Sequence, residues 1–251
     1  MIDLHAHILP GLDDGPPSVE DAIAMARVAS AAGTRAIATT AHIDNRFGLS
    51  PADLAAARDA LAARLADEGI GIELLAGGEI APARLADLDD ETLRGLTLGG
   101  GPYVLLECPL SPGDSGLDLM VADLQRRGFG VLLGHPERSP ALIRDLGRLA
   151  ALTSRGALAQ VTTGSLAGAF GQTVQRAATA MLEQGLVHVL ASDAHDAVRR
   201  SPDLRAGHAL DDAQLAWMTA EAPAAIVAGR PLPERPPLPR RRGFRLTRRR
   251  A

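Results

Sequence analysis

The chain has 251 residues, of which 46% are hydrophobic and 22% charged, which is enough to bury one sizeable core in a single domain. Its one cysteine, Cys108, excludes an intrachain disulfide and a cysteine-based structural zinc site. The net charge of −4 divides into about +8 from Arg230 onward and about −12 on the rest of the chain. Such an acidic body argues against a nucleic-acid partner and suits a site that concentrates cations.

Short apolar, β-branched runs alternate along the chain with longer segments of helical period that are rich in Ala and Leu. The predicted strands are Met1–His5, Arg35–Thr40, Ile72–Ala76, a strand within Leu96–Leu106, Gly130–Leu133, Ala157–Thr162 and Leu186–Ala191. The predicted helices are Ser18–Ala32, Ser50–Gly69, Gly116–Arg127, Ala141–Thr153 and Leu166–Gln184. This alternation predicts an α/β fold built on a parallel sheet or a barrel.

The composition changes after Ala228, where residues 229–251 become rich in Pro and Arg. Such a composition cannot bury a core, so we expect a disordered tail, with attraction to an anionic membrane surface or an acidic partner as the alternative. No window reaches the roughly 18 apolar residues that a membrane span needs. Because Asp3 and His5 also interrupt any secretory signal pattern, we expect a cytoplasmic protein without a membrane span.

Polar residues of metal-ligating types follow almost every predicted strand. They are His5 and His7 at the first strand, His42 after the second, Glu79 after the third, Glu107 at the end of the fourth, His135 after the fifth, and Asp193 and His195 after the seventh. In α/β barrels the carboxyl ends of the strands converge on one face, where the chemistry takes place. We therefore expect these side chains to meet in one pocket.

The residue types in this pocket indicate a site with more than one metal ion. His5 and His7 lie two positions apart, so in a strand both imidazoles face the same ion. Asp14 offers a further oxygen, although an Asp-Asp-Gly sequence is also a common turn. Histidines and carboxylates without a thiolate suit Mn, Fe or Zn. The ligands outnumber those that one ion takes, and a multinuclear site favours hydrolysis of a phosphate ester.

Arg138 follows His135 by three positions, where its guanidinium could hold two phosphate oxygens at once. Alone it would be a surface arginine, but beside the metal ligands phosphate binding is the better interpretation. Arg200, five residues after His195, is a weaker second candidate because Arg199 is adjacent. We expect Cys108 and His188 to be core residues, and His208 to face solvent.

These segments resemble the bacterial capsular-polysaccharide (exopolysaccharide) tyrosine phosphatases of the polymerase-and-histidinol-phosphatase (PHP) superfamily. The resemblance rests on the opening MIDLHAHILPGLDDG, on Gly-Gly-Glu79 and Leu-Glu107, and on Gly-His135-Pro-Glu-Arg138 and Ser-Asp193-Ala-His195. It implies a distorted seven-stranded (β/α) TIM-like barrel over residues 1–228 followed by the tail of residues 229–251. It also implies three divalent metal ions, typically manganese, with iron or zinc as alternatives.

The resemblance also assigns roles to residues. One ion would be held by His5, His7, Glu79 and Asp193, a second by Glu79, Glu107 and His135, and a third by Asp14, His42 and His195, while Arg138 and Arg200 would contact phosphate. The implied substrate is phosphotyrosine on the tail of a bacterial tyrosine kinase that regulates capsule synthesis, attacked directly by a metal-bridging hydroxide. The alternatives are a phosphatase of a small phosphate monoester such as histidinol phosphate, and a non-catalytic metal-binding partner of a kinase.

Overall fold

The computed structural model describes residues 1–113, 116–205 and 210–237, and its strands all pair in parallel. The strand segments of this part of the chain are β1 (Ile2–Ala6), β2 (Ala36–Thr39), β3 (His42–Ile43), β4 (Glu73–Leu75), β5 (Glu79–Ile80), β6 (Tyr103–Glu107), β7 (Gly130–Gly134), β8 (Leu158–Thr162) and β9 (Val189–Ala191). Two of the segments continue a preceding one, since β3 follows β2 and β5 follows β4 after short interruptions.

The sheet closes into a barrel. Its hydrogen-bonded order is β1-β2-β4 in one part and β3-β5-β6-β7-β8-β9 in the other, and the paired segments β2 with β4 and β3 with β5 join the two parts. β1 meets β9 through a bridge between Ala6 and Ala194, where the His7 N–H donates to the Ala194 carbonyl at 2.9 Å. The predicted distorted barrel of seven strands is therefore confirmed, and its distortion lies in the two interrupted strands.

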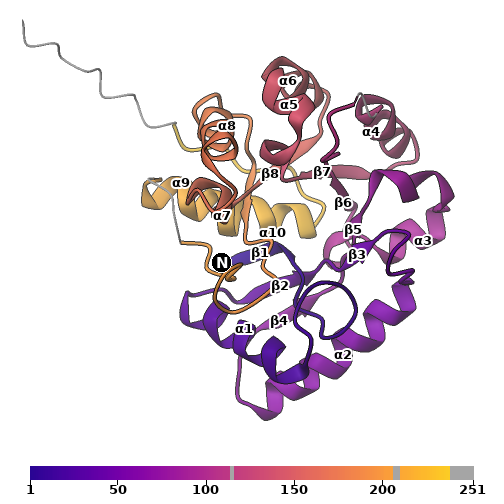
Figure 1. The fold of residues 1–251 in the computed structure, drawn as a ribbon, viewed down its shortest axis with the longest axis vertical. Helices are drawn as coiled ribbons and strands as arrows, with labels where there is room; N and C mark the ends of the chain where they lie inside the picture. The colour runs from indigo at the N-terminus through magenta and orange to yellow at the C-terminus, as the bar shows by residue number, and fades with distance from the viewer. Residues whose placement is uncertain (114–115, 206–209, 238–251) are drawn as a thin grey trace, which may run out of the picture.

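Helices surround the strands, as Figure 1 shows. The α-helices among the described residues are α1 (Val19–Ala31), α2 (Pro51–Asp67), α3 (Asp90–Gly95), α4 (Leu117–Arg126), α5 (Pro140–Arg144), α6 (Leu146–Ser154), α7 (Thr163–Leu166), α8 (Gln172–Glu183), α9 (Asp212–Ala216) and α10 (Ala222–Val227). Short 3-10 turns η1 (Pro82–Asp87), η2 (Leu98–Gly100) and η3 (Pro136–Arg138) and the π-helical turn η4 (Trp217–Glu221) complete the described chain. None of the helices in this part of the chain is long and apolar enough to cross a membrane.

Alternate residues of the strands face two hydrophobic cores. The core inside the barrel contains Leu4, Ala38, Leu105, Leu132, Leu158 and Val189, and is closed by Leu98 and Ile226. The larger core, between the barrel and its helices, takes the neighbouring strand positions, such as Val104 and Leu106 on either side of Leu105. This alternation is the period of two that strands impose, and it fixes which residues reach the ends of the barrel.

The structure breaks the predicted helix Ala141–Thr153 into α5 and α6, and it begins the predicted helix Leu166–Gln184 only at Gln172, as α8. Asp145 has an extended backbone, with φ −141° and ψ 91°, and its carboxylate accepts from the Gly147 N–H at 2.9 Å to begin α6. The segment between α7 and α8 contains Gly168 and Gly171 with φ of 85° and 89°. These left-handed values suit glycine and end the helix at Leu166.

Residues 229–237 pack against the body, although the sequence places the end of the folded domain at residue 228. Gln214 donates to the carbonyls of Pro236 and Pro237 at 2.7 and 2.8 Å, and the Trp217 indole N–H donates to the Pro233 carbonyl at 3.2 Å. Proline carbonyls accept hydrogen bonds as other carbonyls do, so this Pro-rich segment supplies partners to buried donors. Residues 238–251 of the expected tail, and His208, lie outside the described residues.

Candidate metal centre

The carboxyl ends of the strands bring the predicted metal ligands into one buried cluster. His5 and His7 are completely buried, and Glu79, His135, Asp193 and His195 are at most 7% exposed. The side chains of His42 and Asp14 are more open, with 20% and 44% exposed. Six of these eight charged or ionisable groups are thus withdrawn from water, which is unfavourable unless they neutralise one another or bind an ion.

The inner part of the cluster centres on two imidazoles and two carboxylates. The Nε2 atoms of His5 and His7 lie 3.3 Å apart. Asp193 Oδ1 is 3.5 Å from each of these two nitrogens. Glu79 places Oε1 3.4 Å from His5 Nε2 and Oε2 3.3 Å from His7 Nε2, and the same Oε1 lies 2.9 Å from His135 Nε2. Glu79 therefore connects the two sides of the cluster.

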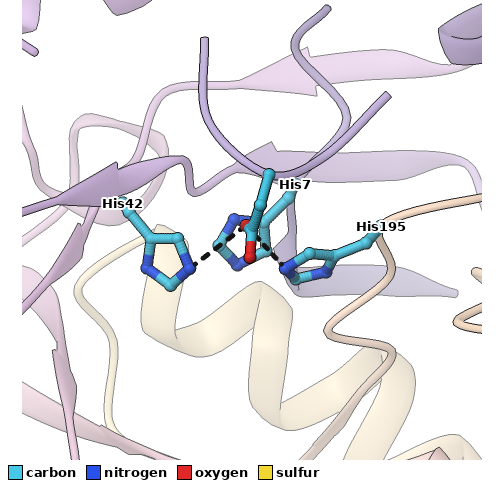
Figure 2. Close-up of side chains that lie close together, drawn as sticks. His7, His42 and His195 are labelled. Atoms are coloured by element: carbon cyan, nitrogen blue, oxygen red, sulfur yellow. Dashed lines mark ion pairs between the residues drawn. The ribbon is translucent and has the colours of Figure 1, made fainter. Parts of the chain in front are cut away.

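The outer part of the cluster opens toward solvent. Asp14 Oδ1 lies 3.4 Å from His42 Nε2 and 3.1 Å from His195 Nε2. Figure 2 shows the imidazoles of His7, His42 and His195 gathered around one point. The ring centroids of His7 and His195 are 4.0 Å apart. Residues from the start and the end of the barrel thus share one small volume.

In three of the histidines the Nδ1 atom lies within hydrogen-bond distance of an acceptor, which fixes the direction in which the Nε2 atom points. His7 Nδ1 lies 2.7 Å from Asp13 Oδ2, His5 Nδ1 lies 3.0 Å from Gln160 Oε1, and His195 Nδ1 lies 3.0 Å from the Asp193 carbonyl oxygen. Each Nδ1 must carry a hydrogen to donate, so in a neutral imidazole the Nε2 atom presents a lone pair to the carboxylates.

Positive charge must therefore lie among these atoms, as protons on the imidazoles or as a bound cation, because ring nitrogens and carboxylate oxygens face one another at 3.3–3.5 Å. A divalent cation supplies that charge, and histidine held through its second nitrogen is the usual form of a metal ligand. Glu79 Oε2 is also buried, 2.9 Å from His42 Nδ1 and 3.3 Å from His7 Nε2, without a well-aligned hydrogen bond to either. The residues present thus fit a site for divalent metal ions.

The pKa values show the same demand for positive charge. Burial would lower the pKa of His7, but its hydrogen bonds with Asp13 and Glu79 raise it to about 10. Burial would raise the pKa of Glu79, yet the positive charge of His5 and the hydrogen bonds from His135 and His42 hold it well below its usual range. Burial and the neighbouring charge of His7 lower the pKa of His195 to about 4, so this imidazole is neutral, as a ligand must be.

Three overlapping groups of the expected ligands have donor atoms close enough to share an ion. The groups are His7 with Asp14, His42 and His195; His5 with His7 and Asp193; and His5 with Glu79 and His135. Glu107, at the end of β6, joins none of these groups. It is half-buried, and its pKa is raised by burial and by the charge of Glu79, so it lies within electrostatic reach of the cluster.

Arg138 and Arg200 both reach Asp193 from outside the cluster. Arg138 Nη1 and Arg200 Nη2 donate to the same oxygen, Asp193 Oδ2, at 2.8 and 2.7 Å. Their side chains are 20% and 29% exposed, so their remaining donors border the open side of the site. Both arginines lie over the ring of Phe170, with Cζ 4.7 and 5.8 Å from the ring centroid.

The sequence reasoning missed three residues that support the ligands. Asp13 Oδ2 accepts from His7 and, at 3.1 Å, from the His42 N–H. Gln160 is completely buried, and its Oε1 accepts from the His5 ring and from the His135 backbone N–H. Asp3 is also buried and accepts from the Ser192 backbone N–H. Asp3 and Gln160 are polar residues inside apolar strands, and that pattern is the signal that could have identified them.

Cys108 and His188 lie outside the cluster, as expected. Cys108 is completely buried, and burial raises the pKa of its thiol well above the usual value. His188 is half-buried, and its Nδ1 accepts from the Ala159 N–H at 3.2 Å.

Comparison with known proteins relates this chain to phosphatases. The model of the family described as capsular polysaccharide synthesis, CpsB/CapC, matches residues 1–216. The chain is 36% identical over 202 residues to the tyrosine-protein phosphatase YwqE of Bacillus subtilis (strain 168), covering 80% of each protein. It is 31% identical over 204 residues to the putative tyrosine-protein phosphatase CapC of Staphylococcus aureus, covering 80% of this chain and 79% of that protein.

A solved structure has the same fold. It comes from the crystallographic work on YwqE from Bacillus subtilis and CpsB from Streptococcus pneumoniae, which are described as metal-dependent tyrosine phosphatases. The TM-score is 0.79 at 32% identity, and the match covers 95% of this chain and 99% of that one. The similarity therefore extends over the whole barrel.

Proposed function

The chain belongs to the CpsB/CapC family of capsular polysaccharide synthesis, and we propose that it is a metal-dependent protein-tyrosine phosphatase. The observation that carries this proposal is the set of three overlapping histidine and carboxylate groups at one end of the barrel. Relatives that cover most of the chain are named tyrosine-protein phosphatases, which supports the same activity here.

The proposed cofactors are three divalent ions, with manganese favoured and iron or zinc as alternatives. His5, His7, Glu79 and Asp193 would hold the first ion, Glu79, Glu107 and His135 the second, and Asp14, His42 and His195 the third. A set of imidazoles and carboxylates without thiolate supports these metals. When bound, such ions lower the pKa of water and neutralise charge on a phosphoryl group, which favours direct displacement by hydroxide.

Arg138 and Arg200 are proposed to hold the phosphoryl oxygens. Each donates one N–H to Asp193 Oδ2 and has further donors in the plane of its guanidinium. Two guanidiniums that share one carboxylate form a fork that matches the geometry of a phosphate. Arg200 Nε is moreover buried without an acceptor, so a phosphate oxygen would satisfy it.

The reaction proposed is a single displacement without a phosphoenzyme. The thiol of Cys108 is completely buried and its pKa is raised, so it cannot serve as a nucleophile. The leaving group would be the phenolate of tyrosine, whose pKa of about 10 makes it a comparatively good leaving group. The open side of the cluster at Asp14 and His42 gives a side chain on another protein access to the ligands.

The proposed substrate is phosphotyrosine on the C-terminal tail of a bacterial tyrosine kinase that regulates capsular or exopolysaccharide synthesis. The match of the family model for capsular polysaccharide synthesis supports this pathway, and the relatives' names support the phosphotyrosine. Histidinol phosphate, a small alcohol ester, represents the rival substrate class.

Metal content measured alongside hydrolysis tests the proposal. Manganese-loaded wild type and His135→Ala would be compared on a phosphotyrosine peptide and on histidinol phosphate. We expect the wild type to cleave the peptide, and the variant to lose both metal and activity because His135 Nε2 faces the bridging Glu79. Cleavage of histidinol phosphate alone would show that the substrate assignment is wrong. Full metal content with no activity on any phosphomonoester would indicate a non-catalytic metal-binding partner of a kinase.

A further inference from the structure

Phe170 lies beside the metal centre, where Arg138 and Arg200 lie over its ring. It stands in the loop between α7 and α8, between two glycines in the left-handed region, Gly168 and Gly171. The Ala169 N–H donates to the Gly164 carbonyl at 2.9 Å, which ties the loop back to α7. A Cβ on Gly164 would lie 3.3 Å from Phe170 Cε2, so the ring packs closely on the backbone there. The half-buried ring is therefore restricted on the side that faces α7.

The ring contacts two long side chains that are otherwise held at one atom, Asp193 Oδ2. Arg138 Cζ lies 4.7 Å and Arg200 Cζ 5.8 Å from the ring centroid, both within the range of a cation–π interaction. The two guanidiniums also share Asp193 Oδ2, which brings two positive charges close together. The electron-rich face of the ring offsets part of the resulting repulsion.

The aromatic contact has a property that a carboxylate lacks. A ring face attracts the flat side of a guanidinium and uses none of its N–H groups, which point outward in the plane. A second carboxylate at this place would occupy the donors that phosphate needs. Phe170 can therefore hold Arg138 and Arg200 in position while their donors stay available.

Resting on the proposed phosphate-binding role of the two arginines, we propose that Phe170 is a positioning residue that orients Arg138 and Arg200 together for a phosphoryl group. The ring does not touch the substrate's reacting atoms. It reduces the rotamer freedom that the arginines would otherwise lose when phosphate binds, which is the general advantage of a preorganised site.

The test measures binding of inorganic phosphate to the manganese-loaded full-length protein by calorimetry, together with metal content and melting temperature. Phe170→Met keeps most of the apolar volume and removes the ring, whereas Phe170→Tyr keeps the ring. We expect Phe170→Met to bind phosphate about 5- to 30-fold more weakly, which corresponds to about 1–2 kcal/mol for ordering two arginine side chains that the ring no longer holds in place. Its metal content should equal that of the wild type, and Phe170→Tyr should remain within about twofold of the wild type in phosphate affinity.

Phe129→Leu provides the matched control for the loss of a phenyl ring. Phe129 is 7% exposed and precedes β7 at the amino end of the strand, so its replacement should leave phosphate affinity unchanged. Kinetics on a phosphotyrosine peptide should show a raised KM for Phe170→Met that Phe170→Tyr restores.

Phosphate affinity of Phe170→Met within about twofold of the wild type would overturn the inference, and so would equal losses in the Met and Tyr variants. Phosphate binding is measured without turnover, so the two proposals can fail separately. If phosphate affinity depends on Phe170 but the wild type cleaves no phosphotyrosine peptide, the proposed function is refuted and the positioning role stays supported.

Discussion

Replacing Gln160 with leucine would remove one acceptor that serves two of the expected metal ligands. Gln160 Oε1 accepts from His5 Nδ1 at 3.0 Å and from the His135 N–H at 3.2 Å, and its amide nitrogen donates to Thr162 Oγ1 at 3.3 Å. The backbone N–H of His135 is an unambiguous donor, so it fixes which end of the amide faces the histidines. In the variant His5 loses the partner that fixes its tautomer.

The expected losses of manganese affinity and of stability follow from the bonds that Gln160 makes with His5 and with the His135 N–H. Removing an outer partner of a ligand histidine typically lowers metal affinity by about 10- to 100-fold, or about 1.4–2.8 kcal/mol. The His135 N–H would also remain buried without an acceptor, which costs about 1–3 kcal/mol. We therefore expect Gln160→Leu to bind manganese about 10- to 100-fold more weakly and to unfold about 1–3 kcal/mol more easily.

Competition with a chelator measures the first quantity, and urea unfolding of the metal-free protein measures the second. Gln160→Glu is the informative companion, because it keeps the accepting oxygen and should retain manganese affinity. Gln125→Leu removes a solvent-exposed hydrogen bond from the half-buried Gln125 to the Arg155 carbonyl and serves as the control. Manganese affinity of Gln160→Leu within about twofold of the wild type would refute the reasoning that the bond to His5 orients the ligand.

Three further changes test other parts of the molecule. Asp13→Asn should weaken manganese binding by about 10- to 100-fold, measured by the same competition, because the amide is uncharged and its nitrogen cannot accept, so either the Oδ2 partners His7 and His42 or the Oδ1 partner Gly15 lose their acceptor; unchanged affinity would contradict this. Burial, and after it the charge of Arg235, lowers the pKa of His188 to about 4. Between about pH 6.5 and pH 4 the unfolded chain therefore binds more protons than the folded protein. The stability that neutral His188 contributes is lost as the pH falls through that window. His188→Asn should therefore lose about 2 kcal/mol less than the wild type between pH 7 and pH 5 in urea unfolding, and equal losses would refute this. Gln214→Leu should lower the free energy of unfolding by about 1–2 kcal/mol without altering metal content, because it removes the two hydrogen bonds to Pro236 and Pro237; a stability equal to that of the wild type would show that these two bonds contribute nothing.

The alternation of strands and helices made the barrel predictable from the sequence. Parallel strands connected by helices place all their carboxyl ends on one face, so ligand-type residues at those ends converge wherever they lie in the chain. His7 and His195 illustrate this: they lie near opposite ends of the folded chain in the sequence, yet their ring centroids are 4.0 Å apart. The resemblance of the motifs added the number of strands, which periodicity alone left open.

The supporting contacts could not be predicted, because they depend on distances between segments that no local pattern contains. Phe170 belongs to a segment of helical period, and only the left-handed glycines of the structure show that the helix breaks there. Asp13 and Asp14 are adjacent and chemically equal in the sequence. The structure separates them, since Asp13 binds the back of His7 while Asp14 faces His42 and His195.

The backbone at the cluster is strained, and the strain explains why the outer contacts matter. Among the described residues the positive φ values outside glycine belong to His135, at 35°, and Asp193, at 50°, and both are expected ligands. Such conformations cost about 1–3 kcal/mol each and persist where the surroundings fix them. The Gln160 acceptor holds the N–H of His135, and the His5 carbonyl accepts from the Asp193 N–H at 2.7 Å where the barrel closes. The closure of the sheet and the aim of the ligands therefore depend on the same few hydrogen bonds, so a change that loosens one will also disturb the other.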